Sequence, residues 1–353
     1  MDKIRSVKIC RFLLLLSWCL LVCSVKRTFA GDGHFLPRIP EHARVVVVHD
    51  AHAVAAFNPQ ADRIEPMVVR GLVNLTGKST AAEAWLSLIS TQDIVGLKVF
   101  SSAGALAGTR PAVVAAVIQT LLSSGLPGNQ IIVWDKYRSD LRLPDVVDLA
   151  KRYGVQLAGS ADHGYDEDIS YSNPILGKLA WGDHEFGRKG EGVARRSFVS
   201  KLVTQKMTKI VNVTPLLNHN LAGVSGNLYG LALGSVDNAL RFETSTERLA
   251  TAIPEIYALP ELGDRVVLNI VDALICQYQG EERTYSHYSS VLGQLRFSKD
   301  PVALDVLSIQ ELNRQRQRAQ IPGVTTNLMI YTNASLLEIG ISDPRKIDIL
   351  TVP

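Results

Sequence analysis

Short apolar runs of strand length alternate with longer helical stretches along most of this 353-residue chain, and this order constrains the fold more than any other feature. The run at residues 45–48 is followed by helical patterns and then by the next apolar run, which implies a crossover between parallel strands. The predicted strands cover residues 44–48, 95–100, 130–134, 155–158, 210–213, 265–271 and 346–352. The predicted helices cover residues 61–75, 79–89, 111–125, 144–153, 301–317 and 334–339. We therefore expect an α/β fold with a mostly parallel, doubly wound sheet.

Capping residues set the ends of several predicted helices. Pro144 suits the first position of one helix, and Gly154 suits the position just past its end. Thr109 is the predicted cap of the helix that begins at Pro111. Asp300 comes directly before a proline and an apolar helix, which is typical of a capping aspartate.

Residues 160–196 break the alternating pattern, because they contain six glycines and many charges but few apolar runs. We expect them to form an irregular or hairpin subdomain inserted into the core. The rest of the sequence shows no internal repeat, low-complexity tract or Pro/Ser linker. The prediction is therefore one α/β domain over residues 31–353, with an inserted excursion at about 160–196.

The first 30 residues read as a secretory signal peptide. Basic residues precede an apolar run at residues 12–25, and Thr28 and Ala30 place small residues at the two positions that a signal peptidase reads. We therefore predict export to the periplasm or the extracellular space, with no stable membrane span after cleavage. The alternative is an uncleaved anchor, although 14 residues between Arg11 and Lys26 are fewer than the roughly 20 that span a bilayer.

Charge and cysteine content exclude several classes of protein. Six of the 37 basic residues lie in the first 30, so the remaining chain is close to neutral and has no basic footprint for nucleic acid. Three of the four cysteines also lie there, which leaves Cys276 alone. One thiol can neither form an intramolecular disulfide nor hold a four-thiolate iron–sulfur cluster. We expect Cys276 to be a small buried hydrophobic residue.

A glycine-rich stretch at residues 211–242 is the predicted site. His219 precedes four glycines, at positions 223, 226, 230 and 234. Such a density has two explanations: a backbone brought close to a ligand, or a helix face of small residues that packs closely. In the first, the backbone of Gly223, Ser225 and Gly226 joins Arg241 in binding a carboxylate or phosphate group.

Polar residues at predicted strand ends form a second group of candidates. Asp50, Lys98, Ser101, Asp135 and Asp272 close or directly follow apolar runs. In a parallel sheet these ends meet at one edge, where carboxylates and a lysine supply an acid and a base or bind a cation. Each aspartate has a simpler interpretation as a turn or helix cap.

Histidines and carboxylates also leave open a divalent metal site, for which the candidates are His49, Asp50, His52 and Asp305. None of them has the spacing of a metalloprotease or zinc-finger signature. The alternative is that each histidine is a surface or core residue.

The stretch GVSGNLYGLALGSVDNALRF resembles the signature of the domain-of-unknown-function 362 family, G-V-T-G-x-L-K-N-L-x-x-G-S-V-x-N-x-x-R-F-H. Further matches in the same order extend the resemblance over most of the chain from about residue 44. Relatives often carry a ferredoxin-like cluster segment, which this chain lacks. Tyr229 and Gly230 replace the Lys-Asn pair of the motif, and Glu243 replaces its final histidine. If those residues are catalytic in the family, this member binds without turnover.

Nucleotide hydrolysis, dinucleotide binding and a serine-hydrolase elbow lack their sequence motifs here. Three hypotheses remain. The first is an exported enzyme that acts on a small anionic metabolite, with His219, Lys98 and Asp272 in acid/base roles and Arg241 as the anion clamp. The second is a ligand- or metal-binding envelope protein without turnover. The third is a structural partner in the envelope.

Overall fold

The computed structural model describes residues 41–353 apart from 174–194, 244, 282 and 323–327. The predicted signal peptide, its cleavage site and the alternative anchor lie outside these described residues. Within them, no helix combines the length and apolar character needed to cross a bilayer.

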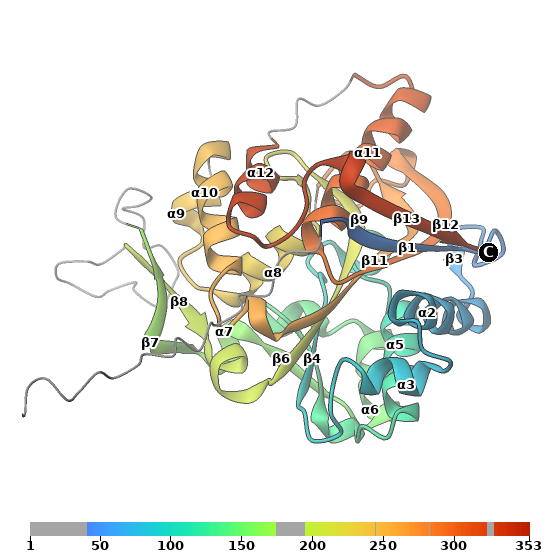
Figure 1. Cartoon of the computed structure of the whole chain (residues 1–353), viewed down its shortest axis with the longest axis horizontal. Helices are drawn as coiled ribbons and strands as arrows, with labels where there is room; N and C mark the ends of the chain where they lie inside the picture. The colour runs from blue at the N-terminus through green and yellow to red at the C-terminus, as the bar shows by residue number, and fades with distance from the viewer. Residues whose placement is uncertain (1–40, 174–194, 244, 282, 323–327) are drawn as a thin grey trace, which may run out of the picture. The chain divides into compact units, whose positions relative to one another are not determined.

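A nine-stranded sheet forms the centre of the fold (Figure 1). Its order is β13-β1-β12-β11-β9-β4-β5-β6, with β10 paired to β9. The strands are β13 (Ile347–Val352), β1 (Ala43–His49), β12 (Ser289–Ser298), β11 (Val266–Gln277), β9 (Lys209–His219), β4 (Val95–Lys98), β5 (Ile131–Asp135), β6 (Gln156–Gly159) and β10 (Gly223–Val224). Antiparallel pairing is confined to β12 with its two neighbours and to β10 with β9. The prediction of a mostly parallel sheet is therefore confirmed.

Helices cover both faces of this sheet, as a doubly wound fold requires (Figure 1). One face packs against α2 (Ala61–Thr76), α3 (Ala81–Leu86), α5 (Pro111–Ser123) and α6 (Pro144–Tyr153). The other packs against α8 (Asn227–Ser235), α10 (Thr246–Tyr257), α11 (Pro301–Arg318) and α12 (Met329–Leu336). Along β1, Val46 and Val48 enter the first core while Val45 and Val47 enter the second. A strand buried on both faces has no polar side, which explains the unbroken valine run.

Two of the three predicted helix caps are confirmed. Helix α6 begins at Pro144, and Gly154 follows its end with φ of 66°. Asp300 caps α11 by accepting a 2.8 Å hydrogen bond from Ala303 N. Thr109 is not the cap of α5, because its hydroxyl instead accepts from Phe100 N at 2.9 Å and donates to a carbonyl of β9 at 2.8 Å. Arg110 takes the capping position.

The described ends of the predicted excursion form a small antiparallel pair of strands, β7 (Tyr165–Ser172) and β8 (Arg196–Ser200). A short helix, α7 (Ser160–His163), leads into β7. The hairpin character expected for this segment is thus confirmed where it is described. The other short elements are β2 (Val54–Ala55), β3 (Asn58–Pro59), α4 (Gly104–Ala107) and α9 (Leu240–Glu243).

The glycine-rich stretch forms the β9–β10 turn and then α8. Gly223 is the first residue of β10, directly after that turn, and has φ of 85°. A Cβ atom at Gly226 would lie 2.1 Å from Asp305 Oδ1, and one at Gly234 would lie 2.4 Å from Lys98 Cε. At Gly230 it would lie 3.0 Å from Ser225 O. These three glycines therefore let the α8 backbone approach protein side chains and backbone, which supports the close-packing explanation of their density.

Candidate functional site

Lys98 and Asp135 meet at the carboxyl ends of β4 and β5, where their Nζ and Oδ1 atoms are 2.8 Å apart. Only 1% of Lys98 is exposed. Lys98 Nζ also donates to Val99 O at 2.6 Å, and the Asp135 carboxylate accepts from the backbone N–H groups of Ser101 and Lys136 at 2.7 and 2.8 Å. The pair is therefore buried and hydrogen-bonded, which is the arrangement of an ion pair that joins two strand ends.

Asp272 lies within β11 and not at its end, because the strand continues to Gln277. Its Oδ1 is 3.0 Å from Arg110 Nη1, and its Oδ2 accepts from Arg110 N at 3.0 Å. Both side chains are buried. This carboxylate thus balances a cation and accepts from an N–H group at the start of α5, and both of its oxygens are bonded to Arg110.

Asp305 holds the first residues of α8. Its Oδ1 accepts from Asn227 N and Nδ2 at 2.7 and 2.8 Å, and its Oδ2 accepts from Leu228 N at 2.9 Å. Burial raises the pKa of this carboxyl to about 6, against the lowering effect of those hydrogen bonds. Ser225 N bonds to Leu217 O at 2.9 Å. The N–H groups of Ser225, Asn227 and Leu228 are therefore bonded to protein oxygens, whereas the sequence predicted that the Ser225 backbone would bind a ligand.

Arg241 is buried beside the β7–β8 pair. Its guanidinium donates to Arg195 O at 2.7 Å, to Ser197 Oγ at 3.0 Å and to Tyr171 O at 3.3 Å. These partners are oxygens of the chain itself, whereas the sequence predicted that Arg241 would bind an anionic ligand. The side chain instead fixes the inserted strands to α9.

The metal candidates are not brought into one cluster. Asp50 Oδ1 accepts from His52 N at 2.8 Å, and His49 is an exposed residue at the end of β1. Asp305 lies apart from them under α8. Among the described residues, no three His, Cys, Asp or Glu side chains are grouped in a way that could hold a metal ion. Cys276 is buried, and burial raises the pKa of its thiol to about 12.

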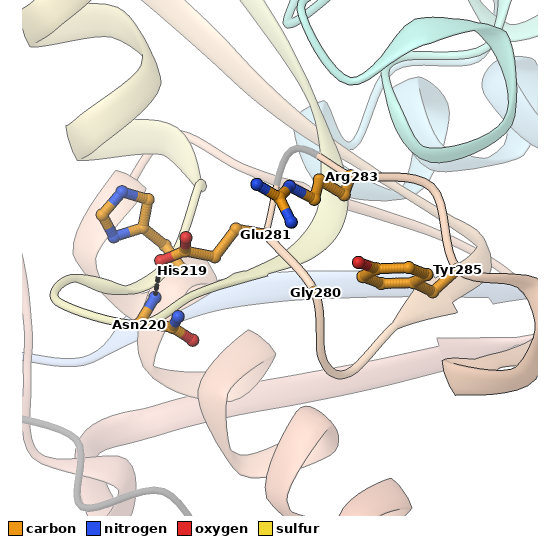
Figure 2. Close-up of a pocket in the computed structure, with 6 residues that line it drawn as sticks. All are labelled: His219, Asn220, Gly280, Glu281, Arg283 and Tyr285. Carbon is orange, nitrogen blue, oxygen red and sulfur yellow. Dashed lines mark hydrogen bonds between the residues drawn. The ribbon is translucent and has the colours of Figure 1, made fainter.

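One predicted residue, His219, lines a cavity of about 470 Å³. Figure 2 shows it with the other residues around this cavity, which are Asn220, Gly280, Glu281, Arg283 and Tyr285. The volume falls in the range of roughly 300–1,000 Å³ that is typical of small-molecule sites. The cavity lies where the parallel strands β9 and β11 end, as the strand-end rule for α/β sheets predicts.

Contacts around His219 set its protonation state. Nδ1 accepts from Ala222 N at 3.0 Å and from Leu221 N at 3.3 Å, so it carries no proton. The ring also lies 4.3 Å from the Tyr229 ring, centroid to centroid. Burial lowers the pKa of His219, and the Glu281 charge opposes that shift only in part. The neutral ring therefore carries its proton on Nε2.

The residues after β11 form the second wall of the cavity, and the sequence reasoning missed them. Glu281 Oε1 accepts from Asn220 N at 2.8 Å, and Glu281 N donates to Asn218 Oδ1 at 3.1 Å. These two bonds connect the loop to the β9–β10 turn. At the end of β11, Gln277 Nε2 donates to Arg283 O at 2.8 Å and so holds the loop to the strand. A signal was present, because charged residues directly follow a long apolar run that ends at Gln277.

The protonation of His219 is open to measurement by NMR titration of its ring nitrogens. We expect an Nε2–H tautomer and a titration midpoint below the ordinary 6.5. The Glu281→Gln variant should lower the midpoint further, because it removes the charge that favours the imidazolium ion. An Nδ1–H tautomer or a midpoint above 6.5 would contradict this description of the site.

Comparison with known proteins places the chain in a family. It is similar to a crystal structure of a Thermotoga maritima protein, a structural-genomics target, with 11% identity and a TM-score of 0.39; the match covers 74% of this chain and 60% of that one. No curated protein matches the sequence. The model of the family described as "Domain of unknown function (DUF362)" matches residues 95–310, from β4 into α11. Because that match covers more than half of the chain, the protein belongs to the DUF362 family.

Proposed function

We propose that the protein binds a small anionic molecule in the cavity beside His219. The observation that carries this proposal is the set of lining residues whose side chains can donate hydrogen bonds: Arg283 through its guanidinium, Asn220 through its side-chain amide and His219 through Nε2–H. Figure 2 shows the Arg283 side chain directed toward Glu281, with His219 beyond Glu281. Arg283 thus takes the role that the sequence assigned to Arg241, whose guanidinium is bonded to Arg195 O and Ser197 Oγ.

Binding without turnover is the form of this function that the contacts favour. Lys98 and Asp272 are held in buried ion pairs, so of the three residues predicted for acid/base roles His219 is the one that lines the cavity. Tyr229, which stands where the family motif has lysine, supports the His219 ring and supplies no amine. Proton abstraction by Nε2 of His219 is the second candidate; it needs a lone pair on Nε2, so an Nδ1–H tautomer in the NMR titration would support it and an Nε2–H tautomer would remove it.

Replacing Arg283 tests the binding site directly. Isothermal titration calorimetry with inorganic phosphate and succinate should show affinity about tenfold weaker or more for Arg283→Gln, because a charge-assisted hydrogen bond is lost. Arg152→Gln removes an exposed guanidinium from α6 and serves as the matched control. Equal affinities for the two variants would contradict the proposed site.

Export is part of the proposal and is supported by the basic, apolar and small-residue segments of residues 1–30. Expression of the full chain in a bacterial host, followed by mass spectrometry of the purified protein, tests it. We expect a mature chain that begins at Gly31 and is recovered outside the cytoplasm. An intact chain recovered from the cytoplasm would contradict export, whereas an intact chain in the membrane fraction would favour the anchor.

A further inference from the structure

The cavity beside His219 is lined by more kinds of side chain than a simple anion would contact. Arg283, His219 Nε2 and the Asn220 amide are hydrogen-bond donors, and these alone suit a phosphate or carboxylate group. Glu281 and Tyr285 line the same cavity. A carboxylate and an aromatic ring beside an anion site favour a ligand that also has hydrogen-bond donors and an apolar face.

Glu281 restricts what lies next to the anion. Its Oε1 accepts from Asn220 N, and among the described residues no hydrogen bond reaches Oε2. A carboxylate repels a nearby anion unless the ligand also presents a donor to it. Hydroxyl groups on the ligand meet this requirement, since each can donate to Glu281 Oε2 while it accepts from the side-chain amide of Asn220.

Tyr285 supplies a fixed aromatic surface. Its backbone N–H donates to Gln277 Oε1 at 2.9 Å, and its ring lies 5.4 Å from the His287 ring and 6.0 Å from the Tyr288 ring. A Cβ atom at Gly280 would lie 2.2 Å from Tyr285 Cδ2, so glycine there lets the loop pack against this ring. The ring is therefore held in place where the apolar C–H face of a cyclic ligand can pack on it.

We infer that the ligand is a cyclic sugar acid, a single ring that carries one carboxylate and several hydroxyl groups. The carboxylate lies against Arg283 and His219 Nε2–H, the hydroxyl groups bond to Glu281 and Asn220, and the ring packs on Tyr285. A cavity of about 470 Å³ has room for one such ring. This inference rests on the proposed anion site and adds the class of molecule that fills it.

Three matched probes separate the parts of the inference by isothermal titration calorimetry with the mature protein. D-glucuronate has the ring, the carboxylate and the hydroxyl groups. Cyclohexanecarboxylate keeps the ring and the carboxylate, and D-glucose keeps the ring and the hydroxyl groups. We expect D-glucuronate to bind at least about tenfold more tightly than either analogue, since each leaves polar groups of the site unpaired.

Two variants test which residues of the cavity give the preference for D-glucuronate. Glu281→Gln and Tyr285→Ala should each reduce the affinity for D-glucuronate by about fivefold or more, with the larger loss of discrimination against cyclohexanecarboxylate in Glu281→Gln. Tyr137→Ala removes a ring that is 47% exposed outside the cavity and should leave the affinity unchanged. Circular dichroism and thermal unfolding establish that each variant is folded.

The outcomes separate this inference from the proposed function. Equal binding of cyclohexanecarboxylate and D-glucuronate overturns the sugar-acid class and leaves the anion site standing. Equal binding of D-glucose and D-glucuronate shows that the carboxylate is not recognised, which overturns both. Failure of folded wild-type protein to bind D-glucuronate overturns the inference, and failure of phosphate and succinate as well overturns the anion site.

Discussion

The buried carboxylate of Asp305 is the interaction on which the site depends. It accepts three hydrogen bonds from the first two residues of α8, at 2.7 to 2.9 Å, and so fixes where that helix begins. Only glycine at position 226 leaves room for this approach. At its far end, α8 lies against Lys98 at Gly234. The helix placed in this way carries Tyr229 to the His219 ring, so a carboxylate outside the cavity determines how one wall of the cavity is built.

Periodicity and capping residues were sufficient to predict the sheet and most of its helices, but not the lengths of the two strands that carry the site. The predicted strands ended at Val213 and Val271, because Pro215 and Asp272 resemble strand ends. In the structure these two residues are register partners, and the pairing becomes irregular after them while both strands continue. Such an irregularity leaves no signal in either strand alone, because it depends on their pairing.

The residues of the candidate site were likewise predicted only in part from the sequence. His219 was predicted from its local sequence, whereas Arg283 and Tyr285 follow a strand whose end was placed six residues too early. The hydrogen-bond partners of Arg241 could not be predicted, because Tyr171 O and Arg195 O lie 70 and 46 residues away in the chain. A sequence shows that a side chain is a hydrogen-bond donor or acceptor. When its partner lies so far away in the chain, only the fold determines which group that partner is.

The most direct test of this account is the stability of Gly226→Ala. Its Cβ atom would lie 2.1 Å from Asp305 Oδ1, whereas at Gly77, with φ of 69°, a Cβ atom meets nothing within 4 Å. In urea denaturation we predict that Gly226→Ala lowers the free energy of unfolding by about 2–3 kcal/mol, through displacement of the carboxylate or helix. Gly77→Ala should cost only the backbone strain of about 1 kcal/mol. A loss at Gly226 no greater than that at Gly77 would contradict the central role of the Asp305 contact.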